Sequence, residues 1–330
     1  MKRNIIVFTI VILMLLLLML TSITIGESNS KASFIEVLVG IFTKDNQIVN
    51  MFVAIRAPRT IVAVCVGAAL GISGVLLQVV TKSNLAEPSI IGVSSSTFLV
   101  HLICGMILPA GLLIISPILA FIVGVLVFAL ILFLSWDNGL KSNRILLVGI
   151  AFNTFILLII LTLIMMTGLN ASAKLMTLIG SLSIPSIEEV YSTVILTVIG
   201  VVFAILLAPK CNVLALGDKV ATGLGVKVNL YKCLLIGLSI FFVSIATKMV
   251  GITAFIGLLA PILAKKLLNK NYFNQIIMSG LLGGIFVLFG DFVGRCIIND
   301  PFSMPVGMIT SLFGGVIFII LLKRSFKNGI

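Results

Sequence analysis

The sequence is short of charge, and above all of acidic residues. Only 10% of its 330 residues are charged, and the ten Asp and Glu residues are outnumbered by 22 Lys and Arg residues. A soluble domain carries about 25% charged residues, so this share excludes an ordinary soluble fold. Hydrophobic residues make up 60% of the chain and the mean hydropathy is +1.33. The composition predicts one all-α polytopic membrane domain over residues 1–330, with no soluble catalytic domain.

Motifs for nucleotide, metal and redox chemistry are also lacking. The sequence has neither a P-loop nor a G-x-G-x-x-G motif, so we expect that it does not bind nucleotide itself. Its five cysteines show no C-x-x-C spacing and it has a single histidine, so no metal site or cofactor is predicted. The spans hold no paired carboxylates or Ser/His pair, which argues against a membrane-embedded enzyme. The net charge of +12 fits cytoplasmic loops and lipid headgroups rather than nucleic acid.

Apolar windows predict about ten transmembrane helices, each near the length of about 20 residues that crosses a bilayer. They cover residues 5–25, 59–80, 90–108, 112–134, 144–167, 190–208, 230–250, 252–268, 273–296 and 305–323. With both termini in the cytoplasm, fifteen of the 22 Lys and Arg residues fall inside, as the positive-inside rule requires. The first run is interpreted as a retained span, because no A-x-A cleavage site follows it.

Three arginines lie at the predicted outer ends of spans. Arg56 and Arg59 precede the second span. Arg295 closes the ninth span, four residues after Asp291, and this spacing permits an ion pair. Guanidinium groups bind carboxylates bidentately, so the arginines suit the docking of an acidic partner. Anchoring of helix ends at lipid headgroups explains them equally well.

Connections on both sides of the membrane show local structure. Residues 83–88 and 141–144 are polar and stand at the cytoplasmic mouth, where they could gate a path or form ordinary turns. Residues 212–228 carry an amphipathic pattern broken by glycines, which fits two short helices with a glycine bend. On the outer side, residues 171–183 fit a short helix at the membrane surface.

Eight blocks of sequence agree in order and spacing with one known family. They are R-A-P-R at 56–59, G-A-A-L-G-I-S-G-V-L-L-Q at 67–78, L-A-E-P-S-I-I-G-V-S at 85–94, L-L-V-G-I-A at 146–151, L-A-L-G-D-K-V-A-T-G-L-G-V at 214–226, F-I-G-L-L-A-P at 255–261, G-D-F-V-G-R at 290–295 and M-P-V-G at 304–307. From about residue 56 to 324 the sequence resembles the permease subunits of ABC importers for ferric siderophores, haem and cobalamin. It departs from them at Ser83-Asn84, where Asn-Pro is usual, and at Ile262, where His is usual.

This resemblance implies a type II ABC importer permease fold that dimerises around a central path. The implied partners are two ATP-binding cassette ATPase subunits, an extracytoplasmic substrate-binding (lipo)protein and a second permease subunit, identical or paralogous. The chain would then be a multi-pass protein of the cell (plasma or inner) membrane with both termini cytoplasmic. It would not be an enzyme, because ATP hydrolysis would take place in the partner subunits.

The resemblance also implies roles for individual residues. Arg56, Arg59 and Arg295 would receive acidic residues of the binding protein. The segment 212–228 would couple to the ATPases, through Leu214, Leu216, Gly217, Asp218, Val220, Ala221, Leu224 and Gly225. The cytoplasmic gate would comprise Ser83, Asn84, Leu85, Ser142 and Asn143. The fifth span and residues 171–183 would border the path.

We therefore predict an importer permease for an iron chelate, with a ferric siderophore as the favoured cargo. Haem and cobalamin are the alternatives within the family. An ion-coupled secondary transporter is the alternative from another class, and it would require essential acidic residues inside the membrane. Asp291 is the one acidic residue well inside an apolar run, and Arg295 stands one turn away to neutralise it.

Overall fold

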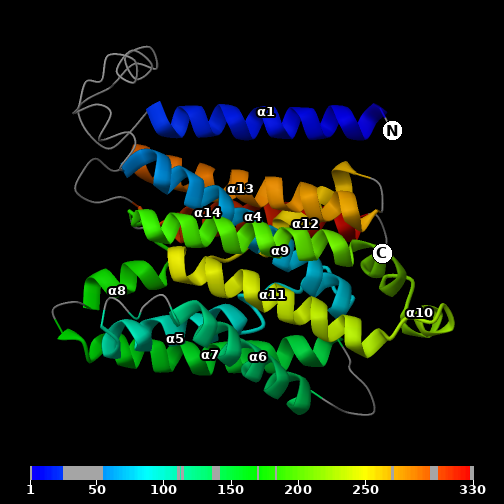
Figure 1. The fold of residues 1–330 in the computed structure, drawn as a ribbon, viewed down its shortest axis with the longest axis horizontal. Coiled ribbons are helices and arrows are strands. Elements are labelled where there is room, and N and C mark those ends of the chain that lie inside the picture. The colour runs from blue at the N-terminus through cyan, green and yellow to red at the C-terminus, as the bar shows by residue number, and fades with distance from the viewer. Residues whose placement is uncertain are drawn as a thin grey trace.

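The computed structural model describes residues 2–24, 55–109, 112, 115–135, 142–168, 171–182, 184–268, 271–297 and 304–327. Over these residues the chain forms twelve α-helices and no strand (Figure 1). They are α1 (Lys2–Thr24), α4 (Ala57–Thr81), α5 (Val93–Ile107), α6 (Ser116–Leu134), α7 (Ser142–Met165), α8 (Ala171–Leu178), α9 (Ile187–Leu214), α10 (Asp218–Gly223), α11 (Val228–Val250), α12 (Ile256–Leu267), α13 (Tyr272–Ile297) and α14 (Val306–Lys327).

The all-α membrane architecture is confirmed, and each of the ten expected spans overlaps one helix. Within the described residues, seven helices are long and apolar enough to cross a membrane, while α5 and the apolar part of α14 are shorter. The twelve residues of α12 rise only about 18 Å, against a hydrocarbon core of about 30 Å. Helix α12 is short because the chain turns at Gly251 and Phe255, both with positive φ, before the helix starts.

Helix α4 lies at the centre of the bundle, where it contacts α9, α11, α12 and α13 (Figure 1). Its small residues permit this position. A Cβ at Gly67 or Gly71 would overlap backbone atoms of α13, and one at Gly74 would overlap the backbone of Gly257 in α12. Because lipid offers no hydrophobic drive between helices, such close backbone packing is what holds a membrane bundle together. The glycine row of α4 is therefore a packing surface.

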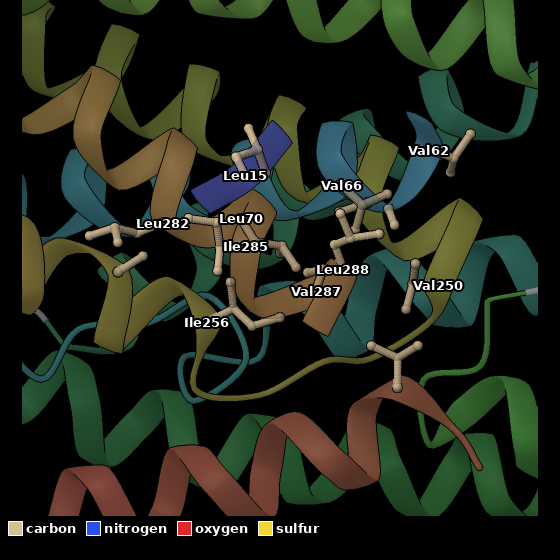
Figure 2. Packing of buried hydrophobic residues seen from close by; sticks show 14 of the residues in the cluster. Leu15, Val62, Val66, Leu70, Val250, Ile256, Leu282, Ile285, Val287 and Leu288 are labelled. Atoms are coloured by element: carbon tan, nitrogen blue, oxygen red, sulfur yellow. The ribbon is translucent and has the colours of Figure 1, made fainter. Parts of the chain in front are cut away.

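The largest buried cluster joins α4 to α13 and to the N-terminal helix (Figure 2). Val66 and Leu70 of α4 belong to it together with Ile285 and Leu288 of α13, and Leu15 reaches it from α1. Helix α1 otherwise lies along one side of the bundle, where only 17% of its most apolar stretch is buried (Figure 1). The centre of the fold is thus closely packed and its N-terminal helix is peripheral.

Helix α9 corrects one expectation for the loop that follows it. It starts at a capping box, in which the Glu189 amide donates to Ser186 Oγ at 3.3 Å and the Glu189 carboxylate accepts from the Ser186 amide at 3.1 Å. It then continues to Leu214, since Cys211 and Leu214 are both buried. The expected pair of short helices in residues 212–228 is therefore wrong, because the first residues extend α9 and only α10 is separate.

The two short helices stand at opposite ends of the bundle (Figure 1). Helix α8 lies after α7, as the expected surface helix, and α10 projects between α9 and α11. The two ends of the bundle can therefore be considered separately as candidate sites.

Candidate functional site

An ion-pair cluster joins α1, α4 and α13. Arg59 of α4 donates from Nε to Asp291 Oδ1 at 3.0 Å, and its Nη2 lies 2.9 Å from the same oxygen. Arg295, one turn after Asp291 on α13, places Nη2 2.8 Å from Oδ2. The expected i,i+4 pair is present, and the contact between Arg59 and Asp291 is new. Each carboxylate oxygen thus faces one guanidinium group.

The same cluster holds the end of α1. Arg295 donates from Nη2 to Ser22 Oγ at 2.6 Å and from Nη1 to the Ser22 carbonyl at 3.3 Å. Arg56 donates from Nη1 to the carbonyls of Ile23 and Thr24 at 3.3 and 3.2 Å. Cations at the C-terminus of a helix satisfy its last carbonyls and its dipole. The peripheral helix α1 is thus secured at this end by charge.

The three arginines are more buried than docking residues were expected to be. Arg56, Arg59 and Arg295 have exposed fractions of 7%, 6% and 7%. Sequence patterns reveal a charge near a helix end but not what covers it, so the burial was not foreseeable. The described contacts make these arginines part of the fold, and their docking role stays a prediction.

The polar turn after α4 forms the second candidate site. The Ala86 amide donates to the Ser83 carbonyl at 3.3 Å, and Gln78 Nε2 donates to the Asn84 carbonyl at 3.2 Å. Lys265 of α12 donates to Asn84 Oδ1 at 2.8 Å and to Gln78 Oε1 at 3.3 Å. We call residues 83–86 the gate turn. Its gating role is a prediction, but its exposed tip is braced from two helices.

The other two gate candidates are only partly described. Ser142 and Asn143 begin α7, and their side chains lie outside the described part of the chain. Residues 136–141, which precede them in the chain, also lie outside the described part. Of the five predicted gate residues, the structure describes the side chains of Ser83, Asn84 and Leu85.

Glu87 is a buried acidic residue that the sequence argument treated only as part of a polar turn. Its side chain reaches the start of α12, where its carboxyl accepts from the backbone amides of Phe255 and Gly257. Burial raises the pKa of Glu87 to about 8, although these hydrogen bonds oppose the rise. Phe255 has φ +69°, a left-handed conformation that a bulky residue seldom adopts. Glu87 thus satisfies the amides of a strained helix start, which only three-dimensional proximity reveals.

The third candidate site is the segment around α10. Leu216, Val220 and Leu224 recur every four residues, and their exposed fractions are 63%, 49% and 62%. On the other face, Ala221 and Leu214 are fully buried against the bundle. Gly217 and Gly225 take positive φ values of 109° and 76° at the two ends of α10. The glycine turns therefore present a row of exposed apolar side chains at the tip of the bundle.

Asp218 begins α10 and connects it to the helices behind it. Its Oδ1 lies 3.0 Å from Nζ of Lys82, and its Oδ2 lies 2.8 Å from Nζ of Lys232. Burial alone would raise the pKa of Asp218, but the hydrogen bonds and charges of Lys232 and Lys82 lower it below its ordinary value. Asp218 is therefore ionised at neutral pH.

These features define a class of protein. A bundle with several membrane-crossing helices, a braced polar turn and an exposed apolar tip is the architecture of a polytopic transport permease. The family follows from the sequence: the chain belongs to the FecCD transport family, whose profile matches residues 12–324.

Individual relatives and solved structures agree with this assignment. The chain is 31% identical over 300 residues to the heme-iron transport system permease protein IsdF of Staphylococcus aureus strain MSSA476, covering 91% of this chain and 90% of that protein. Its fold matches a structure described as an inward-facing conformation of a metal-chelate type ABC transporter, with a TM-score of 0.81, 23% identity and coverage of 97% and 99%. PsaBC from Streptococcus pneumoniae in complex with Fab matches with a TM-score of 0.60, 18% identity and coverage of 87% and 95%. The permease fold expected from the sequence is confirmed.

Proposed function

We propose that the chain is the permease subunit of an ABC importer in the cell (plasma or inner) membrane, with both termini in the cytoplasm. It would pair with a second permease subunit, two ATPase subunits and an extracytoplasmic binding protein. The observation that carries this proposal is the exposure of Leu216, Val220 and Leu224, which lie on and directly beside the short projecting helix α10. Side chains of this size at a polar membrane face require a protein partner, and an ATPase cleft supplies one.

The cargo that we propose is an iron chelate. The sequence favoured a ferric siderophore, and the similarity to a haem-iron permease makes haem the first chelate to test. Cobalamin is the third candidate. All three are bulky and would cross a wide path between two subunits, to which the exposed face of α7 would contribute. Only 22% of the most apolar stretch of α7 is buried within the chain.

Docking of the binding protein would take place at the end of the bundle that holds the arginine cluster. Arg59 and Arg295 contact Asp291 there, and Arg56 donates to the carbonyls of Ile23 and Thr24 close by. Guanidinium groups bind carboxylates bidentately, so an acidic surface of the binding protein would suit this end of the bundle. Direct ion pairs with the binding protein would require the arginine side chains to turn outward.

Transport in right-side-out membrane vesicles tests the proposal. Vesicles from cells that express the whole transporter would be loaded with ATP and offered labelled haem, a ferric siderophore or cobalamin, and vesicles lacking this permease are the control. We expect uptake of one chelate that requires ATP, stops with vanadate and survives collapse of the proton gradient. Uptake that ignores vanadate and stops with the gradient would overturn the proposal in favour of an ion-coupled carrier.

A variant separates the two classes further. Glu87 is a buried acidic residue whose raised pKa would suit a proton-coupled carrier. Glu87→Gln preserves the size and the carbonyl acceptor of the side chain but cannot carry a proton. The importer proposal expects ATP-driven uptake to persist in this variant, whereas a proton-coupled carrier that used Glu87 would lose its gradient-driven uptake.

A further inference from the structure

The end of α4 is tied to α10 by one ion pair. Lys82 is the C-cap of α4, with φ +54°, and the gate turn follows it directly in the chain. Its Nζ lies 3.0 Å from Oδ1 of Asp218, the first residue of α10. A displacement of α10 would therefore reach the gate turn through one side chain and one peptide bond.

Asp218 is shared between two lysines whose side chains differ in exposure. Its other oxygen pairs with Lys232 of α11, whose side chain is 17% exposed, whereas the side chain of Lys82 is 44% exposed. A partly exposed ion pair contributes little stability and exchanges with water readily. The contact to Lys82 is thus suited to breaking and reforming, while Lys232 keeps Asp218 attached to the bundle.

The surroundings leave room for such a movement. A cavity of about 250 Å³ adjoins the pair, and its lining includes Lys82, Asp218, Lys232 and Phe128. On its other side the gate turn is held by Lys265 of α12, which donates to Asn84 Oδ1 at 2.8 Å. Two lysines therefore make contacts at the gate turn. Lys82 directly precedes the turn and pairs with Asp218 of α10, and Lys265 of α12 donates to Asn84.

We propose that Asp218 is a positioning residue for transport, which through Lys82 makes the position of the gate turn follow the position of α10. The inference rests on the proposed function, because it assumes that ATPase subunits move α10. In one state the pair with Lys82 holds the gate turn against α10. In the other state α10 moves away, Lys82 turns into the cavity, and the gate turn keeps its contacts with Gln78 and Lys265.

Charge exchange across the pair tests the proposal in proteoliposomes that contain the whole transporter. We would measure chelate uptake per ATP hydrolysed in Asp218→Lys, in Lys82→Asp and in the exchanged variant that combines both with Lys232→Asp, because a lysine at position 218 would otherwise face Lys232. Lys266→Met, at an exposed position of α12, is the matched control for loss of a cytoplasmic-end lysine. Each single variant should lower the ratio about fivefold or more, the exchange should restore most of it, and the control should leave it unchanged.

A second measurement follows the gate turn itself. Ser83→Cys in a background without the five native cysteines would be labelled by a membrane-impermeant maleimide, with and without ATP plus vanadate. Nucleotide should change the labelling rate when Asp218 is present and should leave it unchanged in Asp218→Asn. A merely structural Asp218 would lower the yield of folded protein without abolishing this response.

The outcomes separate the inference from the proposed function. If nucleotide changes the labelling of Ser83→Cys equally in both backgrounds, and the charge exchange restores nothing, the inference is overturned while the importer stands. If nucleotide has no effect even when Asp218 is present, and ATP drives no uptake, the proposed function itself fails. Should the Asp218 variants not fold, Lys82→Met removes the same contact from the other side and must give the same loss of response.

Discussion

Removal of the carboxylate of Asp291 should damage the fold more than removal of either arginine that contacts it. In Asp291→Asn, Arg59 and Arg295 would both remain buried, at 6% and 7% exposure, without their shared counter-charge. Breaking a buried ion pair so that a charge is left uncompensated costs about 3–5 kcal/mol. At roughly 2–4 °C per kcal/mol, the melting temperature should fall by about 6–20 °C.

The matched comparison is Arg59→Met. Asp291 keeps Arg295 at 2.8 Å in that variant, so a compensated pair survives and the loss should be smaller. The double variant with both substitutions should be more stable than the sum of the single losses predicts, because it removes one of the two arginines that share Asp291.

The assay uses native thiols. Cys104 and Cys211 are buried, so a thiol-reactive dye reports the unfolding of detergent-purified protein as the temperature rises. The reasoning would be refuted if Asp291→Asn melted no lower than Arg59→Met, or if the two losses simply added. In either case the compensation for the buried arginines would have to come from other groups.

Further substitutions test the packing, the buried acid and the apolar tip. Gly71→Leu should prevent folding, whereas Gly105→Ala, where a Cβ meets no atom within 4 Å, should leave the yield of monodisperse protein unchanged. Glu87→Gln should flatten the fall in melting temperature between pH 5 and 8, since the folded carboxyl keeps its proton to a pKa of about 8 and the unfolded one to about 4.5. Leu216→Gln with Leu224→Gln should abolish substrate-stimulated ATP hydrolysis but shift stability by less than about 0.5 kcal/mol.

The sign of the pH effect follows from linkage. Between pH 4.5 and 8 the folded state holds one more proton at Glu87 than the unfolded state, so stability is greatest at low pH and is lost as pH rises. A pH profile of Glu87→Gln that is as steep as that of the unmodified protein would contradict the assignment. Folding of Gly71→Leu would contradict the packing expectation. Substrate-stimulated ATP hydrolysis in the variant with Leu216→Gln and Leu224→Gln would contradict the expectation for the apolar tip.

The sequence predicted the helices well because a long apolar run marks a segment that avoids water, whether it faces lipid or the interior of the bundle. Each expected span corresponds to a helix, and the ion-pair spacing on α13 also held. Contacts between distant segments could not be predicted, because nothing in the local pattern shows that Arg59 contacts Asp291 or that Glu87 contacts α12. The end of α9 was misplaced for a related reason: Pro209 suggests a stop, but the burial of Leu214 keeps the helix going.

The sequence predicts some of the proposed sites better than others. Leu216 and Leu224 belong to the amphipathic pattern predicted for residues 212–228, so the tip was foreseeable. The burial of the arginine cluster was not, because α1 covers it from the other end of the chain. Sites that depend on one segment are therefore visible in the sequence, and sites that depend on several are not.

The glycine row of α4 has a consequence for how such proteins diversify. Where backbone touches backbone at Gly67, Gly71 and Gly74, there is no side chain whose replacement could alter a binding surface, and any enlargement disrupts the bundle. Variation is thus confined to helices with a free face, of which α7 is one. If α7 borders the path, as proposed, an engineer who wished to change the cargo would keep α4 unchanged and randomise the exposed positions of α7.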